Sequence, residues 1–77
     1  MAMMFKDPLG MTAESLIGQS GGRDLSRGGA TVYGPHANYV VASPRTSSDD
    51  VRALVELVRE RVRQRLGVEL IPLIRVW

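Results

Sequence analysis

The chain contains 77 residues, of which 44% are hydrophobic and 23% are charged. This length indicates a single domain over residues 1–77, and the composition excludes wholesale disorder and low-complexity structure. The sequence holds no cysteine, which excludes disulfide scaffolds and thiol chemistry, and its net charge of +2 is too small an excess to predict a nucleic-acid partner.

The N-terminal part of the chain predicts a short strand and a short helix. The strand is expected first, followed by a loop that turns at residues 8–10, where proline and glycine stand close together. Thr12 is a suitable N-cap for a helix that buries Leu16 and Ile17. Gly18 and the glycine pair after it should end this helix after about two turns.

Two strands are predicted in the middle of the chain, over residues 30–33 and 38–42. Both are rich in β-branched and aromatic residues, and the four residues between them favour an antiparallel pair. Just before them, Gly28 and Gly29 are interpreted as a tight turn with close packing. A phosphate-binding loop is disfavoured because these glycines do not lie between a predicted strand and a long helix.

The clearest element is a long helix after Ser47. Ser47 stands three residues before Asp50, a spacing typical of a capping box, and Gly67 stands where a left-handed C-cap is wanted. Apolar residues recur at spacings of three and four, which makes one continuous stripe over about five turns. They are Val51, Leu54, Val55, Val58, Val62 and Leu66.

The last segment, residues 69–77, is predicted to be a strand that Pro72 confines to an edge or a bulge, since proline cannot donate to a strand ladder. The order of elements therefore predicts an α+β fold. We expect a small, mostly antiparallel sheet covered by one long helix and one short helix in two layers.

The polar residues, taken alone, give little sign of chemistry. Nine of the ten basic residues are arginines, and those in the long helix are interpreted as a solvated face because no aromatic residues lie between them to stack on bases. His36 is the only histidine and has no carboxylate cluster near it in sequence, which argues against a metal site. A cytoplasmic location is expected, because the sequence has neither a secretion signal nor an apolar run that could span a membrane.

Four segments follow one another in an order and spacing that a known family shares. They are Phe5-Lys6-Asp7-Pro8 against FKNP, Ala13 to Ile17 against AGxLI, Gly28-Gly29-Ala30-Thr31-Val32 against GGAxV, and His36-Ala37-Asn38-Tyr39-Val40-Val41 against HANFIV. Together they make the chain resemble the C-terminal, substrate-binding domain of the UDP-N-acetylenolpyruvoylglucosamine reductases. The resemblance implies an α+β fold and an ancestral ligand that is a UDP-linked amino sugar.

The resemblance also implies where the family's chemistry takes place. In the family, FAD passes a hydride from NADPH to an enolpyruvyl double bond, and a serine or cysteine protonates the resulting carbanion-like carbon. The flavin domain lies upstream, so this chain is expected to bind neither cofactor itself. The proton donor corresponds to Met3 and an assisting glutamate to Leu73, and neither side chain can transfer a proton. No catalytic residue is therefore expected.

Ligand contacts are expected at four residues, by the same resemblance. Lys6 and Arg23 keep a positive charge, and His36 stands where a polar side chain near the substrate is usual. Asp7 replaces the asparagine of FKNP, and its negative charge should weaken the binding of a pyrophosphate. Further departures from the family pattern suggest a remodelled loop around residues 18–27. They are Glu14, Gly22, Asp24 and Tyr33.

The sequence therefore favours a stand-alone, catalytically inert descendant of the substrate-binding domain that acts with a protein partner or as a homo-oligomer. Two alternatives stay open. One is half of a split reductase that a separate flavin subunit completes. The other is a non-catalytic binder of UDP-amino sugars that rests on Lys6, Arg23 and His36.

Overall fold

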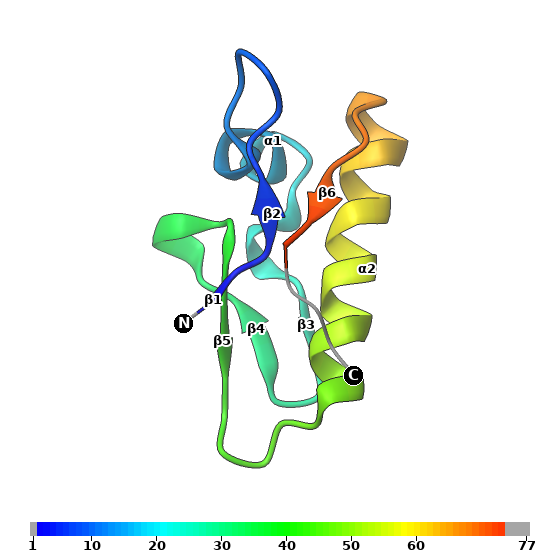
Figure 1. Ribbon diagram of the computed structural model, residues 1–77. Helices are drawn as coiled ribbons and strands as arrows, with labels where there is room; N and C mark the ends of the chain where they lie inside the picture. Colours follow the sequence, from blue (N-terminus) through cyan, green and yellow to red (C-terminus); the bar gives the residue numbers. More distant parts are fainter. Residues whose placement is uncertain (1, 74–77) are drawn as a thin grey trace.

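Two antiparallel sheets, two α-helices and two 3-10 helices make up residues 2–73, the part of the chain that the computed structural model describes (Figure 1). The helices are α1 (Ala13–Gln19), η1 (Gly22–Asp24), η2 (Gly34–His36) and α2 (Ser48–Leu66). The strands are β1 (Ala2–Met3), β2 (Phe5–Lys6), β3 (Ser26–Arg27), β4 (Ala30–Val32), β5 (Tyr39–Ala42) and β6 (Ile71–Pro72). The predicted α+β class is confirmed. The end of the strand predicted over residues 69–77 lies outside the described residues.

The strands form two sheets where the sequence predicts one. The larger sheet has the order β1-β5-β4-β3, the smaller one pairs β2 with β6, and every pairing is antiparallel. The sequence predicts one short N-terminal strand, whereas the chain forms β1 in one sheet and β2 in the other. Met4, which separates them, is fully buried, so the backbone passes between the sheets where this side chain enters the core.

Helix α2 begins and ends where the sequence predicts. The Ser47 hydroxyl accepts a hydrogen bond from the Asp50 N–H (3.1 Å), and the Asp50 carboxylate accepts one from the Ser47 N–H (3.4 Å). These two bonds complete the capping box. Gly67 closes the helix with a left-handed φ of 71°, a conformation that favours glycine.

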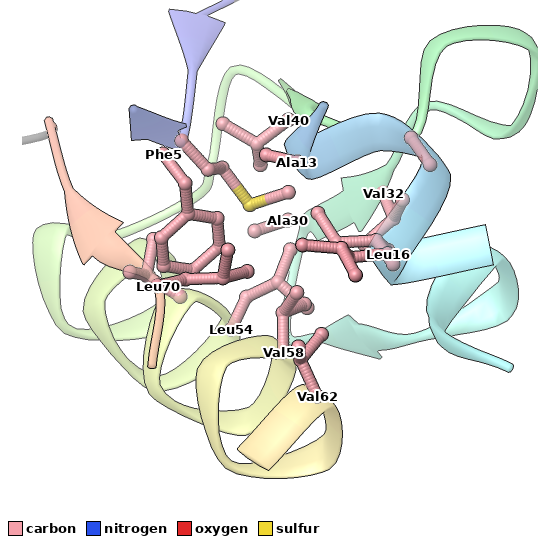
Figure 2. Close-up of a cluster of buried hydrophobic side chains, with 14 residues drawn as sticks. Phe5, Ala13, Leu16, Ala30, Val32, Val40, Leu54, Val58, Val62 and Leu70 are labelled. Carbon is pink, nitrogen blue, oxygen red and sulfur yellow. The ribbon is translucent and has the colours of Figure 1, made fainter. Parts of the chain in front are cut away.

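One hydrophobic core joins both sheets to both α-helices (Figure 2). Helix α2 packs against α1, β3 and β4, and its buried stripe supplies four of the core side chains. The buried members are Met4, Phe5, Ala13, Leu16, Ile17, Ala30, Val32, Ala37, Val40, Leu54, Val55, Val58, Val62 and Leu70. Strands β2, β4 and β5 bury side chains in this core, whereas the side chains of β3 and β6 are exposed.

The turn between β3 and β4 requires both of its glycines. Gly28 has a φ of 55°, and a Cβ atom there would lie 2.3 Å from the carboxylate of Asp50. A Cβ atom on Gly29 would lie 2.3 Å from the hydroxyls of Ser43 and Thr46. The interpretation of this pair as a closely packed turn is confirmed. Neither β3 nor η1 is predicted from the sequence, because two or three residues are too few to show a period.

Pro72 lies in β6 opposite Phe5, and its missing N–H leaves no group unpaired. Both backbone polar groups of Phe5 bond to the side chain of Asn38 and need nothing from Pro72. The pairing continues one residue on, where the Leu73 N–H donates to the Met4 carbonyl (2.8 Å). The predicted edge position of Pro72 is confirmed, since both strands of a two-stranded sheet are edges.

The exposed face of α2 pairs arginines with glutamates three residues earlier. Arg59 donates to Glu56, and Arg63 donates to Glu60. The hydrogen bond from Arg63 lowers the pKa of Glu60 below its usual value. This arrangement supports the interpretation of the arginine run as a solvated face. None of the helices in residues 2–73 has the length and apolar character needed to cross a membrane.

Replacing Leu54 with alanine should destabilise the domain strongly. Leu54 is fully buried, and its truncation leaves a cavity that costs about 2–5 kcal/mol, a large share of the stability of so small a domain. The matched control is Leu9→Ala at a fully exposed leucine, for which we expect a change within about 0.5 kcal/mol. Urea denaturation followed by circular dichroism measures both, and equal midpoints for the two variants would contradict this packing.

Candidate functional site

The side-chain amide of Asn38 holds the N-terminal strands in place. Its Oδ1 accepts a hydrogen bond from the Phe5 N–H (2.9 Å), and its Nδ2 donates to the Phe5 carbonyl (2.8 Å). Its backbone carbonyl accepts a third bond, from the Met4 N–H (2.7 Å). Asn38 is only 5% exposed, so these bonds satisfy polar groups that water does not reach. One residue thus fixes the passage of the chain from β1 to β2.

The two positions that the resemblance links to proton transfer lie close together. Met3 pairs with Tyr39 across β1 and β5, and it is 43% exposed. The backbone N–H of Leu73 donates to the carbonyl of Met4, the residue that follows Met3, and Leu73 is 44% exposed. Both side chains are apolar and half-exposed beside the same stretch of backbone. A thioether and an isobutyl group carry no transferable proton.

A hollow of about 160 Å³ opens beside Met3. The residues around it come from β1, the loop after β2, the start of α1, η2 and the start of β5. They are Met3, Asp7, Thr12, Glu14, His36, Asn38 and Tyr39. Because two carboxylates line it and no lysine or arginine does, we call it the acidic hollow.

A hydrogen bond between His36 and Glu14 and two aromatic contacts fix one wall of the acidic hollow. The Nδ1 atom of His36 lies 3.2 Å from Glu14 Oε1, which ties η2 to α1. The His36 ring stacks on Tyr33 with ring centres 5.9 Å apart and meets Tyr39 edge-on at 6.3 Å. Within residues 2–73, no three His, Asp or Glu side chains are placed to hold a metal ion.

Asp7 has a structural contact that its sequence context does not reveal. Its Oδ1 accepts a hydrogen bond from the Ala13 N–H (2.9 Å), in the first turn of α1. The amide oxygen of an asparagine would accept the same bond, so the change from FKNP to Phe5-Lys6-Asp7-Pro8 adds a charge without removing this contact.

The four predicted ligand residues do not gather in one place. Asp7 and His36 line the acidic hollow, whereas Lys6 lines a second hollow of about 210 Å³, together with Glu69 and again Asp7. Arg23 lines neither of these two hollows. Its guanidinium donates to the Gly34 carbonyl (3.2 Å) and lies against Gly18, where a Cβ atom would lie 2.8 Å from its Nε. Gly18 makes room for Arg23 and does not end α1, which continues to Gln19.

A larger, open hollow of about 580 Å³ lies between the loop after β2 and α1. Its lining residues carry no charge, and they are Gly10, Met11, Thr12, Ser15, Leu16 and Gln19. Its lining therefore offers no acid or base that could activate the hydroxyls of Thr12 and Ser15.

Asn38 and Glu14 are the two important residues whose roles the sequence does not indicate. Asn38 carries a sequence signal, since it is a lone polar residue beside the apolar Ala37 at the entrance to a strand. Such a residue, when buried, needs partners for both ends of its amide. Glu14 departs from the family pattern, but only the fold brings it to His36, 22 residues away.

The fold and the hollow define a small α+β domain in which a long helix packs on a split antiparallel sheet and the N-terminal strands border the site. The chain belongs to the family "UDP-N-acetylenolpyruvoylglucosamine reductase, C-terminal domain", whose model matches residues 1–77. The resemblance seen in the sequence is thereby confirmed.

Curated relatives show the same family and also how much of it the chain represents. The chain is similar to the UDP-N-acetylenolpyruvoylglucosamine reductase of Rubrobacter xylanophilus, at 46% identity over 94% of this chain and 24% of that protein. The reductase of the same name from Acidiphilium cryptum is 44% identical over 92% of this chain and 23% of its own length. The reductase of Clostridium botulinum strain Alaska E43 is 35% identical over 94% of this chain and 24% of its own length. The chain therefore spans about a quarter of the length of these relatives.

Replacing Asn38 with alanine should loosen the N-terminal strands. The change leaves the buried N–H and carbonyl of Phe5 without partners, and we expect a loss of about 2–4 kcal/mol. The matched control is Gln64→Ala, which removes an exposed amide that donates to Glu60 on α2 and should change little. Urea denaturation compares the two, and a loss in Asn38→Ala as small as that in Gln64→Ala would contradict the assigned role.

Proposed function

We propose that this domain takes no part in proton transfer and acts by binding a protein partner. The observation that carries the proposal is that Met3 and Leu73, both apolar and half-exposed, stand at the positions where the resemblance implies a proton donor and an assisting glutamate. The substitution of both roles at one location supports a change of function.

The chemistry of the family explains why these two substitutions matter. Reduction of an enolpyruvyl double bond places a hydride on one carbon and a proton on its neighbour. A positioned general acid typically contributes about 10²–10⁴-fold to the rate of such a step. Met3 and Leu73 supply neither a proton nor a charge that would hold one. We propose that the binding of FAD and NADPH belongs to parts of such reductases that this chain does not match.

One face of the larger sheet supports the proposal that the domain binds a protein partner. Met3 and Tyr39 lie opposite each other in the ladder, and Val41 follows Tyr39 by two residues, which places all three side chains on one face. All three are exposed, at 43%, 36% and 39%, whereas Val40 between them points into the core. Adjacent apolar side chains on one exposed face favour contact with another molecule. We call these three residues the outer sheet face.

In one alternative, the domain completes a split reductase together with a separate flavin subunit. To distinguish the two, the 77-residue chain is mixed with a reductase relative that lacks its own C-terminal quarter, and NADPH oxidation is followed with FAD and the enolpyruvyl substrate present. We expect no rate above that of the truncated relative alone. The same mixture with the Met3→Ser/Leu73→Glu variant tests whether the two side chains account for the loss. Restoration of turnover by the unmodified chain would overturn the proposal.

Binding of a UDP-amino sugar is expected to fail. Asp7 and Glu14 would repel a pyrophosphate in the acidic hollow, and the cations Lys6 and Arg23 lie outside it. Calorimetric titration with UDP-N-acetylglucosamine should show no saturable heat at millimolar ligand. Saturable binding that Arg23→Ala abolishes would instead support the non-catalytic sugar binder.

A further inference from the structure

We propose that the acidic hollow receives one lysine or arginine side chain from an apolar segment of a partner protein, and that the neighbouring residues of this segment lie on the outer sheet face. This inference rests on the proposed function, because it specifies the chemistry of the partner.

The charge of the hollow selects a cation. Two carboxylates, those of Asp7 and Glu14, face it together with the imidazole of His36, which lies 3.2 Å from Glu14, although the whole chain carries a net charge of +2. Each carboxylate has bonding capacity to spare, since among residues 2–73 Asp7 accepts one bond from the Ala13 N–H and Glu14 contacts the His36 ring. A carboxylate offers about four acceptor sites, so both can bond an incoming ammonium or guanidinium group while keeping their present contacts.

The size of the hollow restricts what can enter. Sites for small organic ligands commonly have about 300–1,000 Å³, whereas this one has about 160 Å³. A nucleoside diphosphate exceeds that space, but a single long side chain fits it. The hollow is therefore suited to one residue of a larger partner rather than to a free cofactor.

The walls match the stem of a basic side chain as well as its charge. Met3 and Tyr39 line the hollow with a thioether and an aromatic ring. The methylene groups of lysine or arginine pack against such surfaces while the charged end reaches polar groups beyond. The Tyr39 ring adds the attraction of its face for a cation, and the flexible Met3 side chain adapts to the entering stem.

The hollow is continuous with the outer sheet face because Met3 and Tyr39 belong to both. A segment whose basic residue enters the hollow therefore lays its apolar neighbours over Tyr39 and towards Val41. Many protein interfaces combine an apolar centre with charged groups that fix how the two partners align. A purely apolar partner would cover the hollow without offering a positive charge to the carboxylates of Asp7 and Glu14.

The test uses four labelled seven-residue peptides and fluorescence anisotropy with the 77-residue chain. The peptides share leucine and valine on both sides of a central residue, which is lysine, arginine, norleucine or glutamate. Norleucine keeps the stem of lysine without its charge. We expect the lysine and arginine peptides to bind about tenfold more tightly than the norleucine peptide, and the glutamate peptide to bind most weakly.

Variants separate the hollow from a general charge effect. The double variant Asp7→Asn/Glu14→Gln should lower the affinity for the lysine peptide to that for norleucine, and its asparagine keeps the oxygen that bonds to Ala13. The matched control is Asp24→Asn/Glu56→Gln, which removes the same charge from η1 and α2 and should bind like the unmodified chain. Circular dichroism confirms that each variant is folded.

Three results would overturn the inference. They are equal affinity for the lysine and norleucine peptides, unchanged affinity in Asp7→Asn/Glu14→Gln, and no binding of any peptide at millimolar concentration. These peptide experiments measure binding and not turnover. Their failure would therefore leave the proposed non-catalytic character untouched, because the NADPH assay tests that separately.

Discussion

The position of the whole site depends on the amide of Asn38. The N-terminal strands are two residues each, which is too short for their own ladders to hold them. Asn38 supplies what the ladders lack, by bonding both polar groups of Phe5 and the N–H of Met4. These bonds set Met3 beside Tyr39 on one sheet and let Phe5 pack into the core from the other. Without them, neither the acidic hollow nor the contact between Met4 and Leu73 would have a fixed geometry.

The elements that sequence reasoning predicts well are those whose determinants are local. The capping box of Ser47 and Asp50 and the left-handed Gly67 lie within the helix that they delimit, and the period of its apolar stripe extends over many residues. The strands around residues 30 and 40 are likewise marked by their own composition. They end or begin one residue from the expected place, at Val32 and Tyr39. The Tyr33 carbonyl accepts a hydrogen bond from the His36 N–H in η2, and the Asn38 carbonyl accepts one from the Met4 N–H between β1 and β2.

The site is harder to predict because its contacts join residues that are distant in sequence. The pairing of Glu14 with His36 and that of Asn38 with Phe5 depend on how the elements pack, and no local pattern reports either. The family resemblance does indicate Asp7, His36, Met3 and Leu73 as residues of interest. It does not indicate that Lys6 and Arg23 lie apart from the acidic hollow, since that follows from the alternation along β2 and from the course of η1.

The central claim is that the Asn38 amide, rather than the strand ladders, fixes the passage from β1 to β2. Native-state amide hydrogen exchange of the unmodified chain tests it most directly, since it reports the free energy of opening at single N–H groups. The account predicts that the Phe5 and Met4 amides exchange as slowly as the amides of β5, which open only on global unfolding. Exchange of the Phe5 amide at the rate of the exposed loop around Leu9 would contradict it.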